Sequence, residues 1–192
     1  VIMTHILRPA FTLLVLLTLV TGLAYPLSMT GIAQALMPGN ARGSLIKKNG
    51  QVIGSALIGQ AFASDGYFWP RPSATAEAPY NAAASSGTNL GPTSQKLKDM
   101  VKAEVDRLRA AGLTGKLPAD AATSSGSGLD PQISPDYARL QVPRIAKARS
   151  LSEARLNELL ALHIEGRFLG FIGEPRLNVL LLNLALDAER PS

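Results

Sequence analysis

The residues able to perform acid–base or nucleophilic chemistry are few and scattered. The 192 residues include two histidines and no cysteine, which excludes thiolate catalysis, disulfides and cysteine-ligated metal sites. His5 precedes a long apolar stretch, and His163 falls in a predicted helix, where a lone histidine is usually a packing or surface residue. No serine lies in the glycine pattern of a nucleophile elbow. We therefore expect neither a Ser-His-Asp triad nor a metal site.

Phosphate-binding loops are equally hard to find. No Gly-x4-Gly-Lys-Ser/Thr motif is present, and the glycine-rich run 125–128 follows no evident strand and lacks the third glycine of a dinucleotide fingerprint. The acids Asp130, Glu165 and Glu174 are isolated in sequence, which is typical of turn or capping groups. We expect no catalytic residue and no cofactor held by a motif.

The net charge of +5 does not indicate nucleic-acid binding. Basic and acidic residues alternate, as in the segment 96–109, and no aromatic residues are interleaved with a basic cluster. This pattern is typical of a solvated face on a domain held near anionic lipid.

One stretch determines the organisation of the chain. Residues 9–41 contain no Asp, Glu, Lys, Arg or His, and about 20 apolar residues in a helix cross a bilayer core. We predict an N-terminal flank at 1–8, a transmembrane helix at 9–30, a juxtamembrane linker at 31–42 and one soluble domain at 43–192. Charge counting leaves the side of the membrane open, because large domains translocate largely regardless of charge.

Two alternatives remain open for this stretch. It resembles a cleavable signal peptide in that Arg8 precedes it and Ala33-Gln34-Ala35 has the small-x-small form of a cleavage site. However, the apolar run exceeds the usual length of a signal peptide's apolar region, and the small pair lies beyond its end. A buried core helix is the other alternative, although such a long uncharged run is unusual in a soluble domain.

The rest of the chain predicts an α+β domain with few strands. Residues 44–47 and 52–58 flank Asn49-Gly50, a dipeptide typical of a type I′ hairpin turn. The segment 59–92 is long, rich in Gly, Pro, Ser and Asn, and without periodicity, yet its aromatic residues argue against disorder.

Several helices follow this segment. We predict a helix capped by Thr93 or Ser94, with Leu97, Met100, Val101, Val105 and Leu108 as a core-facing stripe. A second helix begins at Ser134-Pro135 and breaks or kinks near Gln141 because of Pro143. Ser152 caps a third helix, whereas residues 178–187 fit either a strand or a buried helix capped by Asn178.

Within the apolar stretch, Thr18 and Gly22 are four residues apart, and Tyr25 follows. Small residues at this spacing let a neighbouring helix approach closely. We predict that these three residues contact a partner helix. Together with the lack of catalytic motifs, this indicates a membrane-tethered accessory or binding protein rather than a catalyst.

Several motifs together resemble one family over nearly the whole chain. They are Arg8-Pro9, TGLAYPL (21–27), GSALIGQ (54–60), RPSAT (71–75), YNAAASSGTNLGP (80–92), SGSGLDPQISPDYA (125–138), QVPRIAKAR (141–149) and GFIGEPRLNVLLLNLALD (170–187). In this order they resemble the C subunit of the Kdp-type potassium-transporting ATPase. Thr88 stands where that family usually has Ser, and Trp69 occupies a variable position.

The resemblance implies a non-catalytic subunit of a bacterial inner-membrane complex. Its partners would be a channel-like A subunit that carries potassium, a P-type ATPase B subunit and a small F subunit. Members of the family are described as catalytic chaperones that raise the ATP affinity of the B subunit through a ternary complex with ATP. The family architecture places the single helix beside the A subunit and the soluble domain on the extracytoplasmic face, although ATP is cytoplasmic.

Two hypotheses about residues follow from this resemblance. In the first, the 59–92 segment docks on the A subunit through Arg71, Asn81, Ser85 and Asn89, and caps the potassium entry. In the second, Gly59 and Gln60 contact a nucleotide, since the LIGQ sequence loosely resembles a transporter signature motif. The absence of a phosphate loop favours the first.

Overall fold

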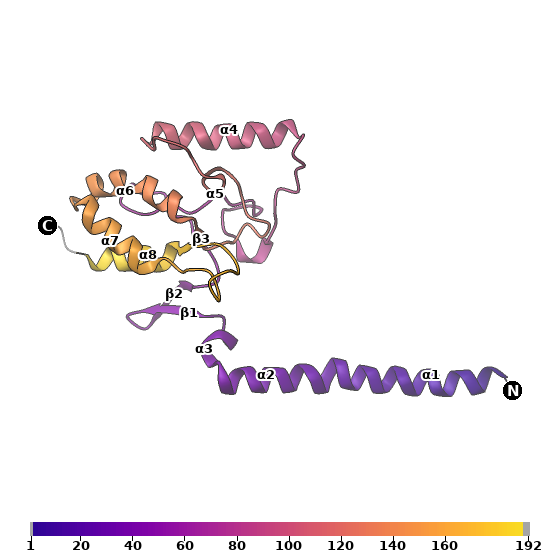
Figure 1. Cartoon of the computed structure of the whole chain (residues 1–192). Coiled ribbons are helices and arrows are strands. Elements are labelled where there is room, and N and C mark those ends of the chain that lie inside the picture. The colour runs from indigo at the N-terminus through magenta and orange to yellow at the C-terminus, as the bar shows by residue number, and fades with distance from the viewer. Residues whose placement is uncertain (1, 190–192) are drawn as a thin grey trace. The chain divides into compact units, whose positions relative to one another are not determined.

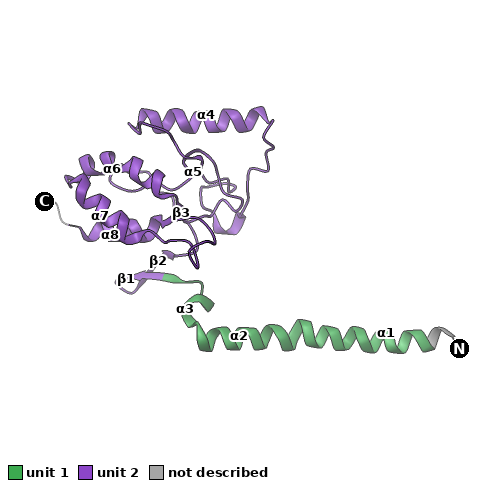
Figure 2. Ribbon diagram, viewed as in Figure 1, with its two compact units in different colours: residues 1–45 green, residues 46–192 purple. Residues whose placement is uncertain are grey.

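The computed structural model describes residues 2–189 and divides the chain into two compact units, 1–45 and 46–192 (Figure 2). The first unit is helical, and the second contains both helices and short strands. The predicted α+β class is confirmed, and the fold is rich in helix.

The N-terminal unit holds one long, continuous apolar helix. It consists of α1 (Ile2–Leu19), a π-helical turn (Val20–Ala24) and α2 (Tyr25–Leu36). The short α3 (Pro38–Ala41) follows as a separate turn of helix. The segment His5–Leu36 is long and apolar enough to cross a membrane, and none of its most apolar window is buried within the structure.

This helix extends beyond the bounds that the sequence predicted. Residues 31–36, assigned to the linker, continue the helix because the first strong breaker is Pro38. Met37, directly before that proline, leaves the helical region at φ −138° and ψ 59°, as residues before proline usually do. The π-helical turn directly precedes Tyr25 and Pro26, where the missing proline N–H disturbs the hydrogen-bond ladder.

The predicted hairpin is confirmed at the start of the soluble domain. β1 (Leu45–Lys48) pairs with β2 (Gln51–Ser55). Asn49 and Gly50 form the turn with φ values of 53° and 81°, the left-handed geometry that a type I′ turn requires.

The other elements (Figure 1) contribute to one hydrophobic core. They are α4 (Gln95–Ala110), α5 (Ala119–Ala122), α6 (Pro135–Arg149), α7 (Glu153–His163), α8 (Val179–Ala188) and the strands β3 (Gln132–Ile133) and β4 (Leu177–Asn178). β3 and β4 pair antiparallel, with Ile133 opposite Leu177. Ser94, Ser134 and Ser152 each accept a backbone N–H at a helix start, so the predicted caps are confirmed.

Of the strand and helix predicted as alternatives for residues 178–187, the structure has a strand only up to Asn178 and a helix from Val179. Asn178 ends β4, and its side chain also accepts the Leu181 N–H and caps α8. Leu182, Asn183 and Leu186 are buried on this helix. The helix is surrounded by core residues on several sides, which explains why its sequence shows no clear period.

Two details of the predicted helices differ in part from the structure: the predicted break at Pro143 is absent, and the predicted stripe on α4 is only partly buried. α6 continues through Pro143 as one helix, because Gln141, Val142 and Ile145 around it are buried in the core and hold the segment in place. On α4 Leu108 of the predicted stripe is buried and Met100 is 43% exposed, while Leu97, Val101 and Val105 are half-buried. This helix packs on the short α5 rather than on a broad face of the domain.

The long segment 59–92 contains a single short 3-10 helix, Ala82–Ala84, among its regular elements. Phe68 and Trp69 from this segment nevertheless lie in the core with 0% and 5% exposure. It is therefore an ordered loop held by side chains, and the expectation that it is not disordered is confirmed.

Candidate functional site

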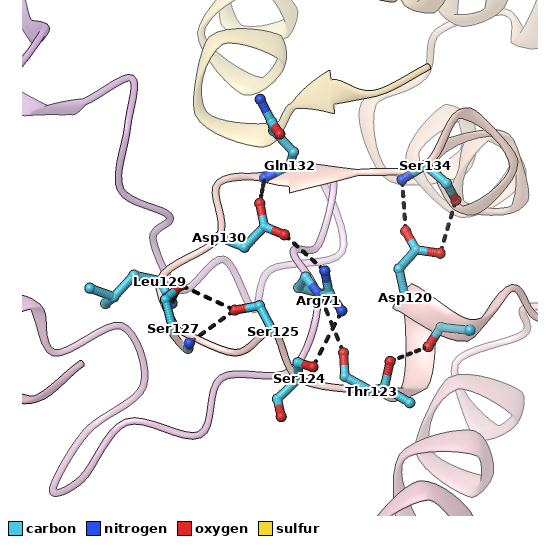
Figure 3. Close-up of polar contacts among 12 residues, drawn as sticks. Arg71, Asp120, Thr123, Ser124, Ser125, Ser127, Leu129, Asp130, Gln132 and Ser134 are labelled. Atoms are coloured by element: carbon cyan, nitrogen blue, oxygen red, sulfur yellow. Dashed lines mark hydrogen bonds and ion pairs between the residues drawn. The ribbon is translucent and has the colours of Figure 1, made fainter. Parts of the chain in front are cut away.

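The centre of the candidate site is an ion pair between two loops. Arg71 Nη1 lies 2.8 Å from Asp130 Oδ2, and the two side chains are 20% and 26% exposed. The same guanidinium donates to the carbonyls of Thr123 and Ser124, both at 3.3 Å. Figure 3 shows Arg71 pointing into the bend of the 123–130 loop, which it fixes to the 59–92 segment.

Two carboxylates, Asp130 of this loop and Asp120 of α5, fix the chain on either side of β3. Asp130 Oδ1 accepts the Gln132 N–H at 3.0 Å, and Asp120 accepts the N–H and hydroxyl of Ser134 at 2.7 and 3.0 Å (Figure 3). These contacts confirm that Asp130 is a turn-forming group, and they give it an ion-pair partner that the sequence did not reveal.

A second layer of contacts surrounds the ion pair. The Tyr80 hydroxyl donates to the Arg71 carbonyl at 2.6 Å, while its N–H donates to Ser73 Oγ at 2.9 Å. Ser73 in turn donates to the Gly128 carbonyl at 2.7 Å. Burial, followed by the charge of Asp130, raises the pKa of the Tyr80 hydroxyl. Tyr80 therefore stays a neutral donor at physiological pH.

Gly59 belongs to the same network. Its N–H donates to the Leu129 carbonyl at 2.7 Å. A Cβ atom added at this position would lie 2.4 Å from Tyr80 Cε1 and 2.8 Å from the Asp130 carbonyl oxygen. The close approach of three chain segments therefore requires glycine here.

Three of the four predicted docking residues lie in this network. Besides Arg71, Asn81 caps the short 3-10 helix by accepting the Ala83 N–H at 3.0 Å, and Ser85 donates to the Ser127 carbonyl at 3.0 Å. Asn89 is exposed outside the network, with a left-handed φ of 53°. We call the surface formed by residues 71–92 and 123–130 the loop face.

Gln60 directly follows Gly59, but its side chain packs against the hairpin. Its Nε2 donates to the Ile53 carbonyl at 2.6 Å, and it lines a small cavity of about 230 Å³ with residues of β2 and α8. The Gln60 amide thus holds β2 on the domain and does not contact the Arg71–Asp130 pair.

The sequence did not identify a buried cation beside Trp69. The Arg144 guanidinium lies 3.6 Å from the centre of the Trp69 ring, and Arg107 lies 4.8 Å from it. Burial lowers the pKa of Arg144 to about 10. Gln141 accepts the Trp69 N–H at 2.7 Å. The only sequence signal was a lone tryptophan in an irregular segment, which did not indicate its partners on α4 and α6.

The predicted helix contacts belong to the N-terminal unit. Around Gly22, an added Cβ would meet only Thr18 Cγ2, at 4.0 Å, and Tyr25 is 64% exposed. The hydroxyls of Thr21 and Ser28 donate to carbonyls four residues earlier, at 2.7 and 2.6 Å. This leaves a shallow surface with satisfied polar groups, suited to lipid or to a helix.

The remaining candidates for chemistry are metal-ligating side chains and the histidine of the soluble domain. Across residues 2–189 no group of three or more His, Asp or Glu side chains is placed to hold a metal ion. His163 Nδ1 lies 2.9 Å from the Leu159 carbonyl within its own helix. The loop face offers ordered hydroxyl, amide and carbonyl groups on a fixed backbone.

Fold and site together define a class: a protein with an N-terminal helix long and apolar enough to cross a membrane, followed by one ordered α+β domain. The family model described as the c chain of the K+-transporting ATPase, KdpC, matches residues 7–188. The chain belongs to this family.

Relatives named potassium-transporting ATPase KdpC subunit match nearly the full length. The protein from Bradyrhizobium diazoefficiens is 56% identical over 94% of this chain and 95% of its own. The one from Rhodopseudomonas palustris strain BisB5 is 58% identical over 94% and 96%. The one from Sorangium cellulosum is 58% identical over 96% and 98%.

Proposed function

We propose that this chain is a non-catalytic accessory subunit of a high-affinity, ATP-driven potassium uptake complex. Its task is to stabilise the assembly of the channel-like A subunit with the P-type ATPase B subunit, which carries out catalysis. The observation that carries the proposal is the Arg71–Asp130 pair at 2.8 Å, which fixes an irregular surface in one conformation. A surface ordered before binding loses less entropy when a partner docks.

In this proposal the loop face contacts the A subunit from the extracytoplasmic side and caps the potassium entry. The transmembrane helix packs beside that subunit through Thr18, Gly22 and Tyr25, in the bacterial inner membrane, with the small F subunit as a further neighbour. Support comes from the open backbone around Gly22 and from membership of a family whose members are chains of a K+-transporting ATPase.

Mutation of the three uncharged side chains of the predicted docking set tests the docking. The triple variant Asn81→Ala, Ser85→Ala, Asn89→Gly keeps Arg71 and Asp130, and the glycine tolerates the left-handed φ of residue 89. We expect weaker co-purification of the A and B subunits and a lower potassium affinity of transport. The matched control is Lys98→Ala with Lys102→Ala on exposed positions of α4. Unchanged assembly and transport in the triple variant would contradict the proposal.

The second candidate function is the catalytic chaperone, with ATP shared between Gln60 and the B subunit. The cavity beside Gln60 also contains Lys48, a cation that could attract phosphate. Its volume of about 230 Å³ is smaller than that of usual ligand pockets, which measure about 300–1,000 Å³. Gln60 and Gly59 are moreover engaged in packing, so we favour the cap over direct nucleotide contact.

Protease treatment of intact spheroplasts separates the two candidates. Cleavage of the soluble domain from outside places it away from cytoplasmic ATP and excludes nucleotide binding in the cell. Protection of the domain, with cleavage only after lysis, would instead support the chaperone.

A further inference from the structure

A second hairpin projects from the domain with apolar residues at its tip. Every residue from Glu165 to Arg176 is exposed, and we call this segment the 165–176 arm. Its two strands meet at Glu165 with Arg176 and at Phe168 with Ile172, through backbone hydrogen bonds of 2.9 to 3.0 Å. The arm is therefore an ordered structure outside the core.

The tip of the arm carries four large apolar side chains without a polar one between them. Phe168, Leu169, Phe171 and Ile172 are 69%, 70%, 71% and 49% exposed. Exposed apolar side chains are common singly, but a contiguous cluster marks a contact surface.

The turn at the tip is strained in order to present a leucine. Leu169 and Gly170 have φ values of 52° and 84°, nearly those of Asn49 and Gly50 at 53° and 81° in the first hairpin. Asparagine is a preferred residue in such a turn, whereas leucine rarely adopts a left-handed conformation. Strain of this kind is found mainly at functional positions.

Charge offers no recognition signal at the arm. Its charged residues are paired along the stem: Arg167 lies 2.7 Å from Glu174, and Arg176 lies 3.0 Å from Glu165. The arm carries two positive and two negative charges, so its net charge is zero. A contact made by the tip must therefore depend on apolar burial.

We infer that the tip of the 165–176 arm inserts into the interfacial region of the lipid bilayer. Four side chains are too small a patch for a specific protein interface, which buries about 800 Å² on each partner, whereas apolar side chains can enter the headgroup boundary singly or in small groups. The chain is also tied to a membrane. From Leu36 to Leu45 the covalent link is nine residues, and so spans at most about 30 Å.

The test uses the full chain alone in nanodiscs of phosphatidylethanolamine and phosphatidylglycerol. Because the sequence has no cysteine, Phe171→Cys gives one site for an environment-sensitive fluorophore, and Lys98→Cys on exposed α4 gives the control. Interfacial elements lie about 5–10 Å into the headgroup boundary, so we expect headgroup-labelled quencher lipids to quench the probe at 171 roughly tenfold more than that at 98. The quenching should persist in 1 M salt, roughly ten times the ionic strength at which the screening length is about 10 Å.

A double variant shows whether the quenching depends on the apolar tip. Phe168→Ser with Leu169→Asn keeps the stem and the turn, and should return the probe at 171 to water with an unchanged circular dichroism spectrum. A probe at 171 that is water-exposed in nanodiscs overturns the inference. So does a probe protected only when the other ATPase subunits are present, because the tip would then contact protein. Neither result affects the loop-face proposal, which co-purification tests separately.

Discussion

Asn183 and Phe68 form a closed pair of hydrogen bonds in the core. The Asn183 Oδ1 accepts the Phe68 N–H at 2.9 Å, and its Nδ2 donates to the Phe68 carbonyl at 3.0 Å. Gln141 does the same for Trp69, at 2.7 and 3.1 Å. Two side-chain amides thus replace a neighbouring strand for a buried segment that has no regular structure, because buried backbone groups must be paired.

Replacing Asn183 should destabilise the domain strongly. In Asn183→Ala two buried backbone groups lose their partners, each at a cost of about 1–3 kcal/mol. The measurement is chemical unfolding of the full chain in detergent micelles. The control is Asn157→Ala on the exposed side of α7, which loses only a bond to the Glu153 carbonyl. Equal unfolding midpoints for the two variants would show that the amide pair does not stabilise the core.

Gly59 should tolerate no side chain. Gly59→Ala places a Cβ 2.8 Å from the Asp130 carbonyl oxygen, a backbone atom that cannot move without disturbing the ion pair, and we expect a loss of about 1–3 kcal/mol. Gly91→Ala is the matched change, because nothing lies within 4 Å of its added Cβ, and should shift stability by about 0.5 kcal/mol or less. Limited proteolysis within 71–92 provides a second readout.

The domain should lose stability in alkali. Burial raises the pKa of the Tyr80 and Tyr137 hydroxyls above the ordinary 10.0. The neutral forms are favoured in the fold, so their contribution is complete below pH 10.0 and declines above it as the unfolded chain ionises. In the wild type each such tyrosine lowers the free energy of unfolding above pH 10.0 by up to about 1.4 kcal/mol per pH unit, and Tyr137→Phe removes this contribution.

Arg144 opposes this trend, which makes the comparison of variants necessary. Burial lowers its pKa to about 10, so deprotonation above that pH relieves a cost in the folded state. Urea unfolding between pH 8 and 11 of wild type and Tyr137→Phe isolates the tyrosine. Parallel curves for the two proteins would argue against a protonated, buried Tyr137.

Exchanging the residues of the two turns should change stability in opposite directions. Leu169→Asn relieves a left-handed leucine and should stabilise by up to about 1 kcal/mol, whereas Asn49→Leu introduces the same strain and should destabilise by a similar amount. Thermal unfolding of both variants measures the effect. A loss of stability in Leu169→Asn would mean that Leu169 packs on the fold, contrary to its 70% exposure.

Local signals in the sequence determined much of the secondary structure. The uncharged run before Arg42 specifies a membrane-length helix, Asn49-Gly50 specifies its turn, and Ser134 followed by Pro135 starts α6 as predicted. Each depends on groups a few residues apart, so its physical cause is present in the sequence. The family followed from several such motifs in order.

Only the tertiary structure decided which distant groups meet. Arg71 finds Asp130 across 59 positions, and Asn183 finds Phe68 across 115. The same packing keeps α6 intact through Pro143 and makes residues 179–188 a helix. Local patterns cannot specify such outcomes, because the free energy comes from burial and pairing between segments that are brought together only by folding.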